Sequence, residues 1–280
     1  MDLELKAFER LRQGEMFSKA YYQKPLMITY SGGKDSDVLA ELALRSGIDF
    51  EIVHSHTTAD APETYRYINE RFKYFEDKGI KCTRVYPMYK GKRVSMWSLI
   101  VDKKIPPTRL MRYCCAILKE TSGKNRAIAT GVRWAESTKR KQGRGIFEGI
   151  NRNKDKKIIL MNDNDEKRQL IERCQIQAKV VVNPVIDWTD KDVWDYLHDC
   201  KCESNPLYQC GFNRVGCIGC PMADKKRYFQ FNRYPKYKDL YIKTFDRMIR
   251  QEPERYKKWK NGYECFEWWM GEDPNQIKLF

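Results

Sequence analysis

A short loop rich in glycine and hydroxyl groups is the part of this sequence best suited to grip phosphate. The run Ser-Gly-Gly-Lys-Asp-Ser spans residues 31–36, between a predicted buried strand at 26–30 and a predicted helix at 37–46. Such a junction offers backbone N–H groups and the positive end of a helix dipole, and glycines let the backbone approach phosphate closely. The Walker pattern of ordinary kinases and GTPases is absent. We therefore expect a phosphate-binding loop of another kind.

Further polar side chains follow two other predicted strands, at the carboxyl edge where open α/β sheets bind ligands. Asp60 and Glu63 follow the strand at 50–54 and could hold Mg²⁺ or ribose hydroxyls, although Glu63 also suits a helix N-terminus. Arg133 follows the strand at 126–130, and a guanidinium can grip phosphate in a bidentate manner. The expected nucleotide-binding residues are Tyr30, Ser31, Gly32, Gly33, Lys34, Asp35, Ser36, His54, Asp60, Glu63, Gly131 and Arg133.

Four of the ten cysteines have a spacing that suits metal binding. Cys217 and Cys220 form a C-x-x-C, in which one turn can bring two thiolates to the same site. Cys114 and Cys115 are adjacent and point differently, which suits a cluster of several irons better than one tetrahedral ion. We expect these four to hold a cluster of several irons. One alternative is a zinc site made by Cys202, Cys210, Cys217 and Cys220. Another is that the thiols are buried and bind nothing.

The phosphate loop and several later motifs together resemble the N-type ATP pyrophosphatases, a family that includes the phosphoadenosine-phosphosulfate reductase superfamily. The later motifs lie at 56–64, 131–137 and 205–221, and the last of these contains Asn-Pro-Leu-Tyr and the C-x-x-C. The resemblance covers roughly residues 20–270. It implies that the loop binds the pyrophosphate of an adenine nucleotide, with adenine bordered by Ile28, Thr29, Tyr30, Val53 and His54. The paired cysteines also resemble the [4Fe–4S] ligands of assimilatory adenylylsulfate reductases.

One departure from the resemblance concerns Cys265. Sulfonucleotide reductases carry a nucleophilic cysteine in a C-terminal Glu-Cys-Gly-Leu-His tail, whereas here Glu264-Cys265 is followed by Phe-Glu-Trp-Trp. We expect these aromatic side chains to dock the segment, and an apolar setting makes a thiol a poorer nucleophile. Reductases of phosphoadenylylsulfate also often have a degenerate loop, and this loop is intact. The sequence therefore favours ATP cleavage over sulfonucleotide reduction.

The elements that must position these motifs alternate along the chain. Strand, helix and strand patterns succeed one another through residues 26–86, which implies a doubly wound parallel sheet in an α/β fold. Another strand is expected at 179–183, and the polar stretch 139–165 indicates a loop or hairpin. We predict a nucleotide-binding α/β domain over residues 1–187 and a Cys-rich helical extension with the C-x-x-C over residues 188–280.

Charge and composition constrain the partners. The 280 residues include 53 Lys and Arg against 38 Asp and Glu, a formal net charge of +15 that favours a polyanionic partner such as nucleic acid. In the predicted helix at 234–249, aromatic residues recur at helical spacing and should dock on the core, while the neighbouring cations could form a nucleic-acid surface. No apolar run reaches 18 residues and the N-terminus lacks an apolar signal region, so we expect no membrane span and a cytoplasmic location.

These observations lead to one expected activity. The enzyme would cleave ATP to AMP and pyrophosphate with Mg²⁺, adenylating an oxygen that sulfur then replaces. Lys34, Ser31 and Arg133 are the expected catalytic residues, because they could stabilise charge on the departing pyrophosphate. The function most resembles that of the ATP-pyrophosphatase component of DNA phosphorothioation systems, which implies a nucleic-acid partner and a sulfur donor such as a cysteine desulfurase. The alternatives are a reductase of adenylylsulfate or its 3′-phosphate, and a non-catalytic nucleic-acid-binding assembly subunit.

Overall fold

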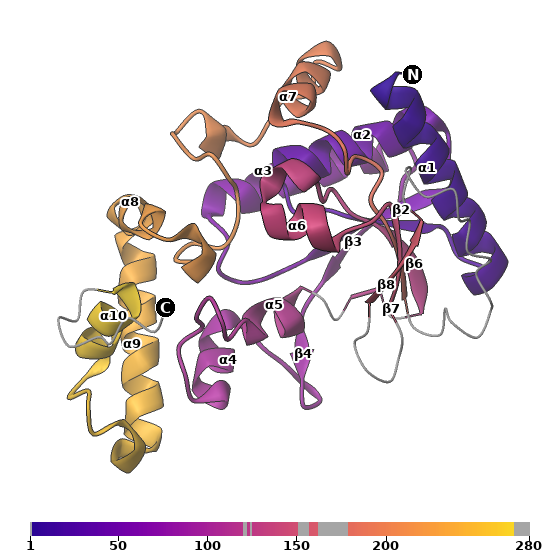
Figure 1. Ribbon diagram of the computed structural model, residues 1–280. Helices are drawn as coiled ribbons and strands as arrows, with labels where there is room; N and C mark the ends of the chain where they lie inside the picture. Colours follow the sequence, from indigo (N-terminus) through magenta and orange to yellow (C-terminus); the bar gives the residue numbers. More distant parts are fainter. Residues whose placement is uncertain (1, 120–121, 124, 151–156, 162–178, 272–280) are drawn as a thin grey trace. The chain divides into compact units, whose positions relative to one another are not determined.

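The chain folds into two compact units. The computed structural model describes residues 2–119, 122–123, 125–150, 157–161 and 179–271 (Figure 1). The first unit comprises Met1–His54, Pro62–Val85 and Ser122–Val215, and the second comprises Ser55–Ala61, Tyr86–Thr121 and Gly216–Phe280. The predicted boundary at residue 187 does not coincide with this division. Helix α7 (Asp190–Asp199) packs on α2 (Lys34–Ser46), so the chain stays in the first unit as far as Val215.

The first unit is built on a seven-stranded sheet in the order β3-β2-β1-β6-β9-β7-β8. Strand β1 pairs in parallel with β2 and β6, and β6 pairs in parallel with β9. Strands β7 and β8 lie within the stretch 139–165 that is predicted to be a loop or hairpin, and they add an antiparallel edge to the sheet; residues 151–156 and 162–165 of that stretch lie outside the described residues. The predicted α/β fold is confirmed, apart from this edge. The strands are β1 (Leu26–Thr29), β2 (Phe50–Ser55), β3 (Cys82–Val85), β6 (Arg126–Ala129), β7 (Phe147–Ile150), β8 (Lys157–Met161) and β9 (Lys179–Val182).

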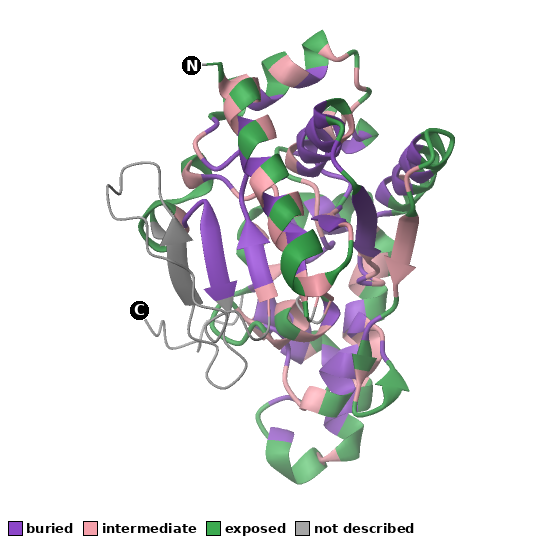
Figure 2. Cartoon of the chain, turned by 90° about the vertical axis from the view of Figure 1, so that its right-hand side faces the viewer, coloured by how far each residue is buried: buried purple, intermediate pink, exposed green. Residues whose placement is uncertain are grey.

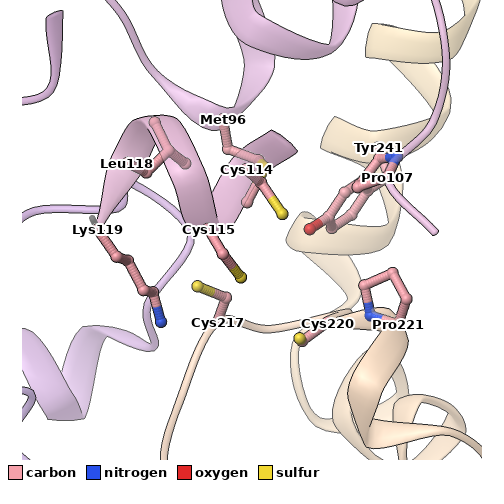
Figure 3. Close-up of a pocket in the computed structure, with 10 residues that line it drawn as sticks. All are labelled: Met96, Pro107, Cys114, Cys115, Leu118, Lys119, Cys217, Cys220, Pro221 and Tyr241. Atoms are coloured by element: carbon pink, nitrogen blue, oxygen red, sulfur yellow. The ribbon is translucent and has the colours of Figure 1, made fainter. Parts of the chain in front are cut away.

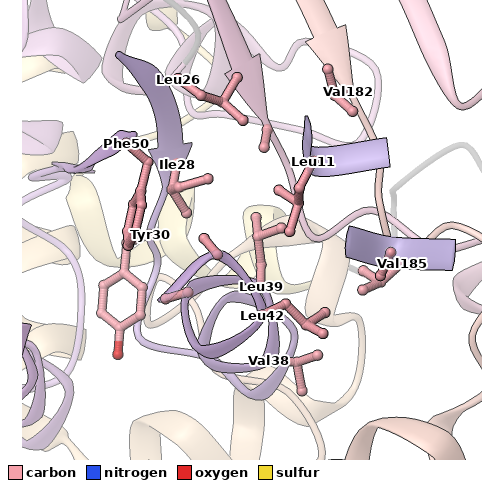
Figure 4. Packing of buried hydrophobic residues seen from close by; sticks show 14 of the residues in the cluster. Leu11, Leu26, Ile28, Tyr30, Val38, Leu39, Leu42, Phe50, Val182 and Val185 are labelled. Carbon is pink, nitrogen blue, oxygen red and sulfur yellow. The ribbon is translucent and has the colours of Figure 1, made fainter. Parts of the chain in front are cut away.

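Both faces of the central strands are buried, which explains their nearly continuous apolar sequences. Successive side chains of a strand point to opposite faces. In β1, Leu26 and Ile28 join the main hydrophobic cluster, whereas Met27 joins a smaller cluster with Val181 of β9. Leu39 of α2 packs in the main cluster (Figure 4). The central strands are therefore buried on both faces, and the phosphate loop follows the carboxyl end of β1.

Two helices of the first unit, α2 and α7, have capped N-termini, and their first turns carry residues of the phosphate site. Helix α2 starts at Lys34, three residues before the predicted start, because Gly33 takes the N-cap position and the Ser36 side chain accepts a hydrogen bond from the Gly33 N–H. Helix α7 is capped by Thr189, whose side chain accepts from the Asp192 N–H. The other helices are α1 (Leu3–Phe17), the π-helix η1 (Ser18–Tyr22), α3 (Pro62–Glu76), η2 (Trp134–Glu136), α6 (Thr138–Gly143) and η4 (Pro206–Tyr208).

The second unit is mainly helical and has an aromatic core. Tyr241, Phe245 and Met248 of α9 are buried, as expected for a docked aromatic face, and Phe231 and Trp269 pack on Tyr241. Buried residues alternate with exposed ones along these helices (Figure 2). The elements are β4 (Met88–Tyr89), β5 (Lys92–Arg93), α4 (Met96–Lys103), α5 (Tyr113–Leu118), η5 (Pro221–Ala223), α8 (Lys226–Arg233), α9 (Pro235–Gln251), η6 (Pro253–Tyr256) and α10 (Gly262–Met270).

Among the helices that the structure describes, none is both long enough and apolar enough to cross a bilayer.

Candidate active site

The predicted phosphate loop adopts a tight, internally bonded turn between β1 and α2. The Ser36 Oγ accepts hydrogen bonds from the N–H groups of Ser31 (3.2 Å) and Gly33 (3.1 Å), and donates one to the Gly33 carbonyl (2.7 Å). Gly32 has φ +72°, and a Cβ built there would lie 2.8 Å from Cγ1 of Ile68. Only glycine satisfies both constraints. Ser36 therefore shapes the loop, whereas the exposed Ser31 remains accessible to a ligand.

Two residues of the Asn205–Tyr208 segment support the loop. The fully buried Asn205 amide donates to the Gly32 carbonyl at 2.8 Å and to Thr64 Oγ1 at 3.2 Å. The Tyr208 hydroxyl accepts from the Lys34 N–H at 2.9 Å. In the sequence this segment was only part of a resemblance, and neither residue was assigned a role. The sequence signal that could have found this segment is its Asn-Pro pair. Asparagine is a common N-cap and proline a common first helical residue, and here they begin the short helix η4.

Lys34 and Arg133, both expected to bind phosphate, meet at the same two carboxylates. The Lys34 Nζ lies 3.3 Å from Asp35 Oδ1 and 2.9 Å from Asp190 Oδ1. Arg133 donates from Nε to Asp35 Oδ1 at 2.7 Å and from a terminal nitrogen to Asp190 Oδ1 at 2.5 Å. The two cationic side chains are 9% and 1% exposed, so they are held in fixed positions beside the loop. Two desolvated cations at one point could bind an anion that takes the place of one of these carboxylates.

Asp190 is the main site residue that sequence reasoning missed. Its side chain is 73% exposed, yet one of its oxygens touches both cations. The hydrogen bonds from Lys34 and Arg133 lower the pKa of its carboxyl below the usual value, so it stays ionised. In sequence, Asp190 looks like an ordinary acid in the first turn of a capped helix, and no local pattern distinguishes it.

Other predicted nucleotide-binding residues have structural partners. The Tyr30 ring is buried against Phe72, its hydroxyl bonds Asp37, and its N–H donates to the Val53 carbonyl, so the residue has a structural role. The His54 Nδ1 shares a 2.9 Å hydrogen bond with the Tyr30 carbonyl, a structural contact. The loop at Gly131 presses on α2, because a Cβ there would lie 2.7 Å from the Asp35 carbonyl oxygen.

The two expected Mg²⁺ or ribose ligands lie in different units. Glu63 is in the first turn of α3, where it complements the helix dipole. Asp60 belongs to the second unit, where its carboxylate accepts from Thr57 Oγ1 at 2.6 Å and its carbonyl accepts from the Tyr237 hydroxyl at 2.7 Å. The roles of Ser31, Lys34 and Arg133 in catalysis, and of the other residues in nucleotide binding, stay predictions.

The second unit brings the four expected cysteine ligands around one pocket. Cys114 and Cys115 lie on α5, and Cys217 and Cys220 flank the turn before η5. The Cys115 and Cys217 sulfurs face each other, with Cys114 and Cys220 around the same space (Figure 3). The pocket is lined by Met96, Pro107, Cys114, Cys115, Leu118, Lys119, Cys217, Cys220, Pro221 and Tyr241.

Positive charge accompanies these thiols. A hydrogen bond from Cys114, helped by Arg112 and Lys119, holds the pKa of Cys115 below its usual value, while burial raises the pKa of Cys217 to about 12. The negative charge of a Cys217 thiolate raises the pKa of Lys119. Lys119 and Arg112 are thus placed to offset the charge of a thiolate-ligated group.

The donor set fits an iron–sulfur cluster better than a single ion. Among the described residues, no group of three or more His, Cys, Asp or Glu is close enough to hold one metal ion. A tetrahedral zinc site needs its four sulfurs about 2.3 Å from one ion. A [4Fe–4S] cluster instead takes four thiolates, one on each iron, and these are farther apart. The alternative zinc set is divided between the units, with Cys202 and Cys210 in the first and Cys217 and Cys220 in the second, and it stays a prediction.

Cys265 is placed as the aromatic sequence predicts. It lies on α10 and is completely buried, and burial raises the pKa of its thiol above the usual range. A buried neutral thiol on a packed helix is a poor nucleophile. The expectation that this segment is docked rather than mobile is confirmed.

The mostly parallel sheet with a Ser-Gly-Gly loop after its first strand defines a PP-loop nucleotide-binding fold. More narrowly, the chain belongs to the phosphoadenosine phosphosulfate reductase domain family, which it matches over residues 25–223. The predicted superfamily is therefore confirmed, and its members act as enzymes on nucleotides.

Individual relatives include proteins of archaea and bacteria. The chain is 27% identical over 240 residues to the uncharacterized protein MJ0066 of Methanocaldococcus jannaschii, covering 85% of this chain and 41% of that protein. It is 28% identical over 207 residues to adenosine 5′-phosphosulfate reductase of Anoxybacillus flavithermus, covering 71% of this chain and 74% of that protein. The chain thus spans less than half the length of MJ0066.

Two solved structures resemble it at low identity. Phosphoadenylyl-sulfate reductase from Candida auris superposes with a TM-score of 0.47 and 15% identity, covering 75% of this chain and 87% of that chain. The U34-tRNA thiolase NcsA from Methanococcus maripaludis superposes with a TM-score of 0.42 and 11% identity, covering 92% and 81%.

Proposed function

We propose that this protein is an ATP pyrophosphatase that adenylates an acceptor oxygen so that sulfur can replace it, and that the acceptor is a nucleic acid. The observation that carries the proposal is the convergence of Lys34 and Arg133 beside an intact loop, within 2.9 Å of a single carboxylate oxygen. Two fixed cations of this kind suit the leaving pyrophosphate of ATP, whose charge grows in the transition state. A sulfonucleotide offers no pyrophosphate to such a site.

In the proposed reaction, a lone pair of the acceptor oxygen attacks the α-phosphorus of ATP. The bond from that phosphorus to the bridging oxygen breaks, and its electron pair leaves on pyrophosphate. Lys34, Arg133 and the loop amides would stabilise this leaving group. A sulfide-level nucleophile from a donor such as a cysteine desulfurase then displaces the adenylated oxygen, and AMP leaves with that oxygen. The displacement itself involves no oxidation or reduction, but releasing sulfide from the persulfide of a desulfurase takes two electrons, which a thiol reductant would supply.

Two further groups have candidate positions. Mg²⁺ is commonly bound by one or two carboxylates together with substrate phosphates. Asp190 could supply such a carboxylate once phosphate has replaced it on Lys34 and Arg133. Cys114, Cys115, Cys217 and Cys220 would hold a [4Fe–4S] cluster, which would supply a site for binding sulfur. Its ligands would be set among the cations Arg112 and Lys119, which favour thiolates over thiols.

A reductase of adenosine 5′-phosphosulfate is the second candidate, favoured by the names of several relatives. That activity needs a thiolate that can attack sulfur. The buried Cys265 does not meet this need, because reaching a nucleotide would require α10 to leave its aromatic core. We therefore rank the reductase below the pyrophosphatase.

The decisive experiment compares substrates on anaerobically purified protein. ATP with Mg²⁺ and nucleic acid should release pyrophosphate and AMP, whereas adenylylsulfate with a thiol reductant should release no sulfite. Lys34→Ala should abolish pyrophosphate release, and Lys24→Ala, at an exposed lysine outside the loop, should not. Sulfite release without ATP consumption would favour the reductase. Unchanged turnover in Lys34→Ala would contradict the site.

A further inference from the structure

We propose that single-stranded nucleic acid binds to a basic and aromatic surface on the second unit, next to the cysteine pocket. This surface, called the rim here, consists of Arg109, Arg112, Lys225, Lys226, Tyr228 and Phe229. All six residues are exposed. The inference rests on the proposed function in one respect, namely that the sulfur acceptor is a nucleic acid.

The cations of the rim are close in sequence to the four cysteines that line the pocket. Arg112 precedes Cys114 by two residues and donates to Cys115 Sγ at 3.5 Å. Lys225 and Lys226 follow Cys220 closely, at the start of α8. Arg109 lies 4.0 Å from Asp224, so the loop before α5 and the segment before α8 meet at the surface. A polyanion crossing this junction would pass beside the pocket.

The aromatic part of the rim lies on the exposed face of α8. Helix α8 buries Arg227, Gln230 and Phe231 against the unit, and Arg227 stacks on Trp269. Its other face exposes Phe229, which is 46% accessible, directly after the cationic start of the helix. An exposed phenylalanine gains nothing from water, but a base can stack on its ring while phosphates bind the lysines nearby.

The combination of groups favours single strands over the other polyanions. Bases in a duplex are already stacked on one another, so an exposed ring offers them little, whereas an unpaired base presents its face. The cations alone would suit any polyanion, including an acidic protein. It is Phe229 among lysines that specifies a nucleobase, and the adjacent pocket would place that strand beside the proposed sulfur site.

The test is direct binding without ATP, so that its failure is distinct from failure of the pyrophosphatase proposal. Anaerobic full-length protein is titrated into a labelled mixed-sequence single-stranded DNA, the same sequence as RNA, and the duplex, with fluorescence anisotropy as readout. Phe229→Ala should weaken single-strand binding roughly five- to 150-fold, the range expected for loss of one stacked base. Phe229→Trp should retain binding. Tyr263→Ala removes a ring of similar exposure, 49%, from α10 and should have no effect.

Charge is tested with matched pairs. Lys225→Glu with Lys226→Glu should reduce the magnitude of the salt slope of log K by about 0.7 for each phosphate that the lysines no longer bind. Lys73→Glu with Lys78→Glu makes the same change in net charge on α3 and the turn after it in the first unit, and should leave the slope unchanged. Several results would overturn the proposal. One is an equal change of the salt slope in the two double variants, and another is unchanged single-strand binding by Phe229→Ala. Tighter binding of the duplex than of the single strand, or displacement of the single strand by poly-glutamate as effectively as by unlabelled DNA, would also overturn it. Absence of binding at low salt would overturn it too.

Discussion

Replacing Asp190 by asparagine should make the loop a better anion site when Mg²⁺ is absent. In the structure, one carboxylate oxygen of Asp190 contacts Lys34 at 2.9 Å and Arg133 at 2.5 Å. A phosphate group that binds these cations must displace that oxygen. Asparagine has nearly the same shape but no charge, so the competitor is weakened while Asp35 still holds Arg133.

The size of the effect follows from the exposure of Asp190. Hydrogen bonds to buried charges contribute about 1.5–3 kcal/mol, but exposed ion pairs contribute only about 0.2–1 kcal/mol. The two cations are buried, whereas the Asp190 side chain is 73% exposed. A value near the top of the exposed range, about 1 kcal/mol, corresponds to roughly fivefold tighter pyrophosphate binding.

The assay is calorimetric titration of inorganic pyrophosphate into Asp190→Asn and wild-type protein, with EDTA and then with Mg²⁺. With EDTA the variant should bind about fivefold more tightly. With Mg²⁺ the order should reverse, because the asparagine is a weaker ligand for a hard cation. Asp192→Asn, in the same first turn, is the control, because that carboxylate caps α7 and touches neither cation. Weaker pyrophosphate binding by Asp190→Asn in EDTA would refute the reasoning.

Three other predictions concern buried groups. Cys217→Ser should lower the iron content of anaerobically purified protein and bleach its visible absorption, and a colourless wild type with one zinc would contradict the cluster. Cys265→Ser should leave pyrophosphate release within a few-fold of the parent, and loss of activity with intact iron content would support the reductase instead. Burial raises the pKa of Asp37 to about 7, so between its unfolded value of 3.8 and about 7 the folded state binds more protons and loses stability as pH rises. In urea unfolding, the free energy of unfolding of Asp37→Asn should therefore rise relative to that of the wild type by up to about 4 kcal/mol between pH 4 and pH 8. A difference between the two proteins that does not change with pH would contradict the raised pKa.

Local patterns predicted the part of the site that is contiguous in sequence. The phosphate loop is readable because strand, glycines, lysine and helix all lie within about one element, and their order fixes their geometry. The C-x-x-C is readable for the same reason. The burial of Cys265 followed from aromatic residues on both sides of it in the chain.

Residues that meet through the fold alone could not be predicted. Asp190 reaches Lys34 across 156 positions of the sequence, and Tyr208 reaches the Lys34 amide across 174. Neither residue has a type or spacing that indicates a partner. The antiparallel edge of the sheet has a similar cause, since a polar hairpin can lie on the surface or add to a sheet without any change in its local pattern.

The support of the phosphate loop also bears on how this protein ages. Asn205 uses both amide hydrogens and its oxygen, so conversion to aspartate would set a carboxylate against the Gly32 carbonyl. Asparagine normally deamidates when the backbone nitrogen of the next residue attacks the side chain and closes a ring. Here that residue is Pro206, which has no N–H and cannot make the attack. The amide on which the loop depends is therefore followed by the residue that best protects it from this slow chemical damage.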